Sequence, residues 1–125
     1  MQSKPKRGDR VAERVRAEIM DLLLRGAVRD PEVRDVIVTV VRVSADLRHA
    51  RVYVRLLEPA VADAQKQAVV SGLTRAASYI RREIAPKLKL KYQPELKFFW
   101  DEGLDQASRI EALLDEVRNE SKDSA

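Results

Sequence analysis

Residues 36–56 decide the fold, and they read VIVTVVRVSADLRHARVYVRL. The opening segment, Val36–Val43, is β-branched at almost every position, which predicts a strand, and its two apolar faces favour a central place in a sheet. A turn is predicted at residues 44–48. At residues 50–56 apolar and polar residues alternate, which indicates a strand with one buried face. Because the two strands lie so close in sequence, we expect them to pair as an antiparallel hairpin.

Before the hairpin, the sequence predicts one amphipathic helix. Apolar residues recur at helical spacing from Ala12 to Leu23. Asp9 is the expected N-cap, and Gly26 stands where a C-terminal cap is expected. Residues 1–8 show no apolar periodicity, so we expect them to form a flexible basic arm.

After the hairpin, residues 61–84 carry a long helical pattern. Gly72 and the run Ala76, Ala77 and Ser78 are weak points at which one helix can bend into two. We therefore expect a kinked pair of helices.

The remaining elements complete an α+β domain at residues 9–118. A third strand is predicted at residues 95–100, an appended acidic helix at 104–118 and a disordered tail at 119–125. The order helix, strand, strand, helix, helix, strand predicts one helical layer on a three-stranded sheet, with the C-terminal helix added. This connectivity is similar to that of the type II KH-like fold, which is an RNA-binding architecture.

Composition narrows the classes of function. The 125 residues suffice for one domain, and the absence of cysteine excludes disulfides and thiolate sites and fits a reducing compartment. No apolar run has the length of a signal peptide or membrane span, so we expect a cytoplasmic protein. Residues 1–100 hold 21 Lys/Arg against 12 Asp/Glu, a net charge of +9, whereas residues 101–125 hold 3 against 8, or −5. A basic body favours polyanionic partners.

The sequence offers little for catalysis. His49 is the only histidine, and we interpret it as a partly exposed residue at the end of a strand. Asp30, Glu32 and Asp35 form a carboxylate cluster that a metal-dependent hydrolase would need, although Asp30-Pro31 is sufficiently explained as a turn. The glycines at 8, 26, 72 and 103 match neither a phosphate-binding loop nor the Gly-x-x-Gly loop of standard KH domains. We expect no enzyme activity, no metal and no cofactor.

A basic segment at residues 72–97, with seven basic and two acidic residues, is the best candidate for contact with RNA phosphates. Tyr79 and Tyr92 lie within it; packing against the core is the favoured interpretation of each, and stacking on bases is the alternative. Arg51 and Arg55, on the open face of the second strand, and the arm residues Lys6 and Arg7 are weaker candidates. The candidates in the basic segment are Arg75, Arg81, Arg82, Lys87, Lys89 and Lys91.

Four segments together resemble the ribosome-binding factor A family of bacteria, over about residues 8–118. The segments are Arg29-Asp-Pro31, VVRVSADLRHARVYV at 40–54, LTRAASYIR at 73–81 and LKLKYQPELKF at 88–98. The resemblance implies a KH-like domain whose helix pair is broken by an Ala-x-Gly kink. That kink would be Ala76, Ala77 and Ser78, with serine in the place of the usual glycine.

The resemblance also implies a function. Members are assembly factors that bind the free or immature small (30S) ribosomal subunit at its 16S rRNA, assist late rRNA processing and support growth in the cold. It implies no cofactor, no membrane partner and no small-molecule substrate. We expect a monomer whose further partners are other assembly factors such as assembly GTPases. A general KH-like RNA-binding protein, or a ribosome-associated adaptor that acts through its acidic C-terminal helix, is the alternative.

Overall fold

The structure, a computed structural model, describes residues 7–58, 60–103, 114 and 117–118. The predicted arm up to Lys6, most of the predicted helix at 104–118 and the tail at 119–125 lie outside the described residues. The elements are α1 (Arg7–Leu24), β1 (Val36–Val43), β2 (His49–Leu56), α2 (Asp63–Leu88) and β3 (Glu95–Trp100).

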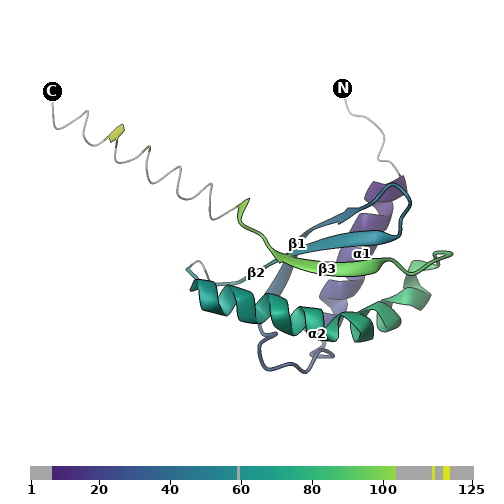
Figure 1. The fold of residues 1–125 in the computed structure, drawn as a ribbon, viewed down its shortest axis with the longest axis horizontal. Helices are drawn as coiled ribbons and strands as arrows, with labels where there is room; N and C mark the ends of the chain where they lie inside the picture. Colours follow the sequence, from purple (N-terminus) through teal and green to yellow (C-terminus); the bar gives the residue numbers. More distant parts are fainter. Residues whose placement is uncertain (1–6, 59, 104–113, 115–116, 119–125) are drawn as a thin grey trace.

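The three strands form one mixed sheet in the order β1-β2-β3 (Figure 1). β1 and β2 are antiparallel, as the hairpin predicted, and β2 and β3 are parallel. Together with the two helices, the sheet confirms the α+β, KH-like fold class. The prediction that β1 is the central strand is wrong, because β2 lies between the other two. The second apolar face of β1 instead holds half-buried residues such as Ile37 and Val40, which pair across the sheet with Arg55 and Tyr53.

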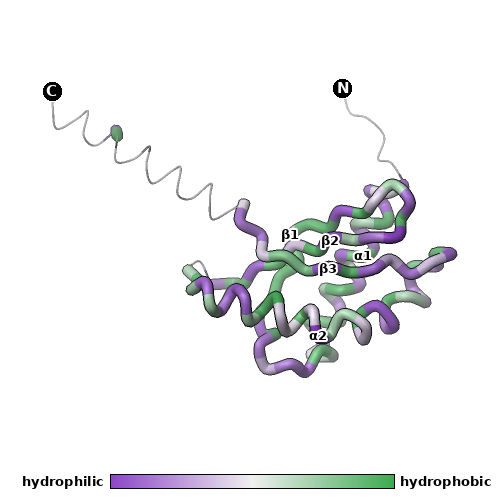
Figure 2. Tube along the Cα trace, in the orientation of Figure 1, coloured by the Kyte–Doolittle hydropathy of each residue, from purple (hydrophilic) through white to green (hydrophobic). Residues whose placement is uncertain are grey.

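The core lies between one face of the sheet and the two helices. Alternate residues of β2, from Ala50 to Leu56, are buried there, and so are Leu96 and Phe98 of β3. Most of β1 is coloured as hydrophobic in Figure 2, whereas apolar and polar residues alternate along β2. The helices add the fully buried side chains Val15 and Ile19 from α1 and Val69, Leu73, Ile80 and Ile84 from α2. This packing leaves the other face of the sheet without a helix among the described residues.

α1 ends as predicted and begins earlier than predicted. Gly26 has φ +69°, its N–H donates to the carbonyl of Leu23 at 3.1 Å, and the N–H of Ala27 donates to the carbonyl of Leu22 at 3.0 Å. These bonds are a Schellman cap, which favours glycine because of its positive φ. The helix starts at Arg7, so Asp9 lies in the first turn, where its carboxylate favours the positive end of the helix dipole.

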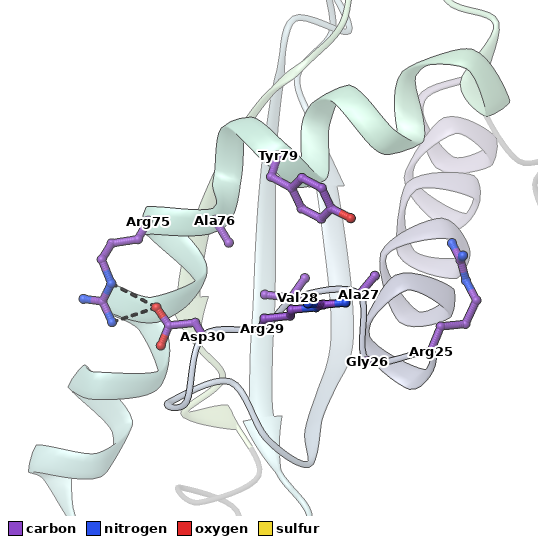
Figure 3. A pocket seen from close by; sticks show the side chains of 9 residues that line it. All are labelled: Arg25, Gly26, Ala27, Val28, Arg29, Asp30, Arg75, Ala76 and Tyr79. Carbon is purple, nitrogen blue, oxygen red and sulfur yellow. Dashed lines mark hydrogen bonds and ion pairs between the residues drawn. The ribbon is translucent and has the colours of Figure 1, made fainter.

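The expected helix pair is one continuous helix, α2, in the structure. Its axis bends in the stretch between Ala76 and Tyr79 (Figures 1 and 3). Ser78 is not among the described residues with positive φ, so the bend needs no left-handed residue. Alanine and serine both tolerate helical backbone, which explains why the hydrogen-bonded helix is not interrupted there. It ends only past Pro86, at Lys89, whose φ is 52°.

Neither α1 nor α2 combines the length and the apolar character that a helix needs to cross a membrane.

Candidate nucleic-acid interface

An open cleft lies where the loop that follows α1 passes the bend of α2 (Figure 3). Its volume is about 710 Å³. The residues that line it are Arg25, Gly26, Ala27, Val28, Arg29, Asp30, Arg75, Ala76 and Tyr79. We call it the arginine cleft, because it brings together three arginines from two elements that are far apart in the sequence.

Two glycines set the shape of the arginine cleft. Gly26 turns the chain out of α1 through its positive φ. Gly72 is buried in α2, and a Cβ atom there would lie 3.0 Å from Val33 Cγ2 and 3.2 Å from Asp30 Oδ1. Contacts at these distances are tighter than nearly all Cβ contacts in proteins, so with any other residue at position 72 the loop would have to move back by a few tenths of an ångström.

Asp30 and Arg75 join the two walls of the cleft. Arg75 donates from Nε to Asp30 Oδ2 at 3.0 Å, and its Nη2 forms an ion pair with the same oxygen at 3.0 Å. The N–H of Glu32 donates to Asp30 Oδ1 at 3.0 Å. The hydrogen bond from Arg75, aided by that from Glu32, holds the pKa of Asp30 below its usual value. The same pair raises the pKa of Arg75. Asp30 is therefore ionised and engaged in an ion pair and a turn.

The predicted carboxylate cluster does not assemble. Asp30 is held by Arg75, and nowhere in residues 7–58 and 60–103 do three or more His, Cys, Asp or Glu residues gather as a metal site. The other catalytic candidate, His49, is exposed at the start of β2, with Nδ1 3.6 Å from Glu95 Oε2. The described residues thus contain no constellation that would support hydrolysis by a bound metal.

Arg29 differs from the other two arginines of the cleft. Arg25 pairs with Asp21 at 2.9 Å and Arg75 with Asp30, whereas exposed Arg29 has no ion pair within the described part of the chain. The ring of Tyr79 projects from α2 toward the loop (Figure 3). In Figure 3 the side chain of Arg29 extends away from the pair of Asp30 and Arg75, so the two arginines offer separate contacts to phosphates. A base can lie against the ring of Tyr79.

Two of the predicted cations have structural roles. Arg81 is half-buried and donates from Nη2 to the carbonyl of Gln93 at 2.6 Å, which ties α2 to the loop before β3. Lys87 lies 3.6 Å from Glu18 Oε2 and 3.8 Å from Asp21 Oδ2, so it links α2 to α1. Arg82 and Lys89 are exposed and, among the described residues, have no ion pair.

Two cationic side chains lie against the ring of Tyr92, just after the end of α2. The guanidinium of Arg48 lies 4.7 Å from the centre of its ring, and the Lys91 ammonium lies 5.5 Å from it. The ring is 53% exposed, so the favoured interpretation that Tyr92 packs against the core is wrong. Tyr79 does pack against the core with part of its ring, and it also lines the arginine cleft.

The other predicted residues lie elsewhere. Arg51 and Arg55 are on the face of the sheet opposite to the helices, and exposed Arg7 opens α1. Lys6 is outside the described residues. At the bend, Ala76 and Ala77 are half-buried and Ser78 is exposed.

Sequence reasoning missed Arg25, Arg29 and Arg48 as site residues. The Gly26 cap was a signal that the loop turns back after α1. Which basic residue of that loop stays without a partner depends on the approach of Asp30 to Arg75, 45 positions apart in the sequence, and spacing does not reveal that approach.

Comparisons with known proteins agree with the fold. A Thermotoga maritima protein solved by NMR has a TM-score of 0.69 and 28% identity, with 82% of this chain and 94% of that chain covered. A homology model of Thermus thermophilus ribosome-binding factor A, fitted into a cryo-EM map of its complex with the 30S subunit, has a TM-score of 0.51 and 22% identity, with 70% of this chain and 92% of that chain covered.

Sequence comparisons give the family. Ribosome-binding factor A of Gemmatimonas aurantiaca is 44% identical over 116 residues, which cover 92% of this chain and 77% of that protein. The family model of ribosome-binding factor A matches residues 7–114. The chain therefore belongs to the ribosome-binding factor A family.

Proposed function

We propose that this chain is an assembly factor that binds the free or immature 30S subunit in the cytoplasm and assists late maturation of its 16S rRNA, including in the cold. The observation that carries the proposal is the arginine cleft, in a chain of this family. Arg29 presents a charge that no described residue neutralises, and Arg75 with its spare donors and the ring of Tyr79 line the same cleft. Such a set suits the phosphates and exposed bases of folded RNA.

The proposed mechanism makes and breaks no covalent bond. A factor of this kind shifts rRNA between conformations only through its different affinity for each of them. One arrangement of the rRNA backbone would bind this chain more tightly than another. The contacts would come from the arginine cleft, from exposed Arg82 and from the cations around Tyr92. The complex of a Thermus thermophilus relative with the 30S subunit supports the choice of partner.

Co-sedimentation of the full chain with purified free 30S subunits at increasing salt tests the proposal. Arg29→Gln is expected to weaken binding and to reduce the slope of log affinity against log salt by about 1, since it removes one phosphate contact. Arg34→Gln is the matched control, because Arg34 is exposed in the same loop, does not line the cleft and has no ion pair with any described residue. A chain that fails to sediment with the subunits at low salt, or equal losses for both variants, would refute the proposal.

A further inference from the structure

The face of the sheet opposite to the helices has a regular arrangement of side chains. Both helices pack on the other face, where alternate strand residues are buried. On the uncovered face, Arg42, Arg51 and Lys97 are exposed and form a row across all three strands, since Arg42 pairs with Arg51 and Arg51 pairs with Lys97. We call these three residues the cationic row.

The cationic row does not help the fold. Like charges directly opposite each other on neighbouring strands destabilise a sheet. Within residues 7–58 and 60–103, no carboxylate lies within ion-pair distance of Arg42, Arg51 or Lys97. The arrangement becomes favourable once a polyanion lies across the three strands.

An aromatic pair lies next to the cationic row on the same face. Two residues further along β2 and β3, Tyr53 and Phe99 are directly paired, and their rings stack with centroids 5.6 Å apart at an angle of 30°. Phe99 is 39% exposed, and Val40 of β1 lies beside Tyr53. The two rows are separated by about 6.6 Å along the strands, a separation that one nucleotide can bridge from its phosphate to its base.

The carboxylates beside this face are already engaged. Glu95 lies 3.6 Å from His49, and Asp101 accepts a 2.6 Å hydrogen bond from the hydroxyl of Thr39. The face as described thus offers excess positive charge beside an accessible aromatic surface.

We propose that this uncovered face binds single-stranded RNA, with phosphates on the cationic row and an unstacked base on Phe99 and Tyr53. Bases that are free of a duplex stack on aromatic side chains while basic residues follow the backbone, and such stacking does not require a particular base. A duplex would leave the aromatic pair unused. The inference rests on the proposed function but assigns a second surface, on the far side of the sheet from the arginine cleft.

The test uses the full chain labelled with ¹⁵N and a fluorescein-labelled ten-nucleotide oligouridylate. The oligouridylate is expected to shift the amide signals of Arg42, Arg51, Tyr53, Lys97 and Phe99. Phe99→Leu keeps an apolar side chain but removes the ring, so its affinity for the oligouridylate, measured by fluorescence anisotropy, should fall by about tenfold or more. Thermal unfolding of this variant verifies that it folds.

Charge is tested with a matched pair of variants. Arg51→Gln should reduce the salt slope of oligouridylate binding by about 0.7, the value for one phosphate contact on a single strand, whereas Arg34→Gln should leave it unchanged. Equal effects of the two variants, or unchanged affinity in Phe99→Leu, would overturn the inference. If 30S binding depends on Arg29 while the oligouridylate moves no signal of the sheet, this inference fails and the proposed function stands.

A second experiment tests whether the acidic segment after β3, and not RNA, binds this face. Neutralising Glu111, Asp115 and Glu116 to their amides tests it in the full chain without RNA. The amide signals of Arg51 and Phe99 could move on this neutralisation and stay in place with oligouridylate. That result would show that the face binds the chain's own acidic segment, and it would refute the inference. Signals that respond to oligouridylate alone support it.

Discussion

The ion pair of Asp30 with Arg75 lowers the net positive charge of the arginine cleft. It leaves some N–H groups of the Arg75 guanidinium free to donate hydrogen bonds. The guanidinium carries five N–H donors, and two of its nitrogens bind Asp30 Oδ2. Arg75 can therefore fix the loop against α2 and still donate to a phosphate. Arg29, next to Asp30 in the sequence, has no such ion pair with any described residue. The affinity of the cleft for a phosphate therefore depends on which arginine pairs with Asp30.

Replacing Asp30 tests this division of roles. Because Arg75 holds the pKa of folded Asp30 below the ordinary 3.8, ionised Asp30 stabilises the folded chain above that pH, and the contribution is lost as the pH falls through the lowered pKa. Asp30→Asn should thus be less stable than the parent chain at pH 7, and urea unfolding at decreasing pH should show the difference shrinking below about pH 3.8. A difference that stays constant with pH would mean that the carboxylate charge is irrelevant. The same variant should bind 30S subunits with a salt slope steeper by about 1.

At the scale of elements, the residue pattern of α2 predicted a helix but not that this helix is continuous. The apolar stripe correctly predicted a helix against the core. It predicted two helices because Gly72 and the run at 76–78 were interpreted as breaks, yet neither glycine nor serine leaves helical backbone there. Gly72 is needed for the approach of the loop with Val33 and Asp30, a tertiary contact that the helix pattern does not contain.

Gly72→Ala separates these two roles of the glycine. Helix propensity alone predicts a gain in stability of about 1 kcal/mol, but the new Cβ would press on Val33 and on Asp30, which is held by two partners. We expect a net loss of about 1 kcal/mol in the free energy of unfolding, together with weaker 30S binding. A melting temperature above that of the parent chain would contradict the close approach of the loop to α2 at Gly72.

At the scale of the whole molecule, the strands were predictable and the partners of the charges were not. β1 and β3 have the predicted bounds, because β-branched and aromatic runs bounded by turns indicate strands locally. The excess of basic over acidic residues in the segment at 72–97 indicated a surface for RNA phosphates. It gave no sign that Lys87 pairs with Glu18 and Asp21 of α1, because that contact depends on how the two helices pack.

Lys87 and Arg82 therefore form a matched test of structural and binding roles on one helix. Lys87→Gln should cost about 0.5–1 kcal/mol of stability, because Lys87 is exposed while the side chain of its partner Glu18 is only 14% exposed, and it should affect 30S binding little. Arg82→Gln should leave the melting temperature unchanged and reduce the salt slope of binding by about 1. The opposite result, with binding lost on replacing Lys87 and retained on replacing Arg82, would show that the binding surface includes the α1 side of the helix.

The most direct test of the central claim is crosslinking to the 30S subunit with mapping of the contacted nucleotides. A photo-crosslinking amino acid in place of Arg29 probes the arginine cleft, and one in place of exposed Glu13 on α1 serves as the control position. We expect crosslinks to a defined stretch of 16S rRNA from position 29 and few or none from position 13. Crosslinks from position 29 to ribosomal proteins alone, or the same nucleotides from both positions, would contradict it.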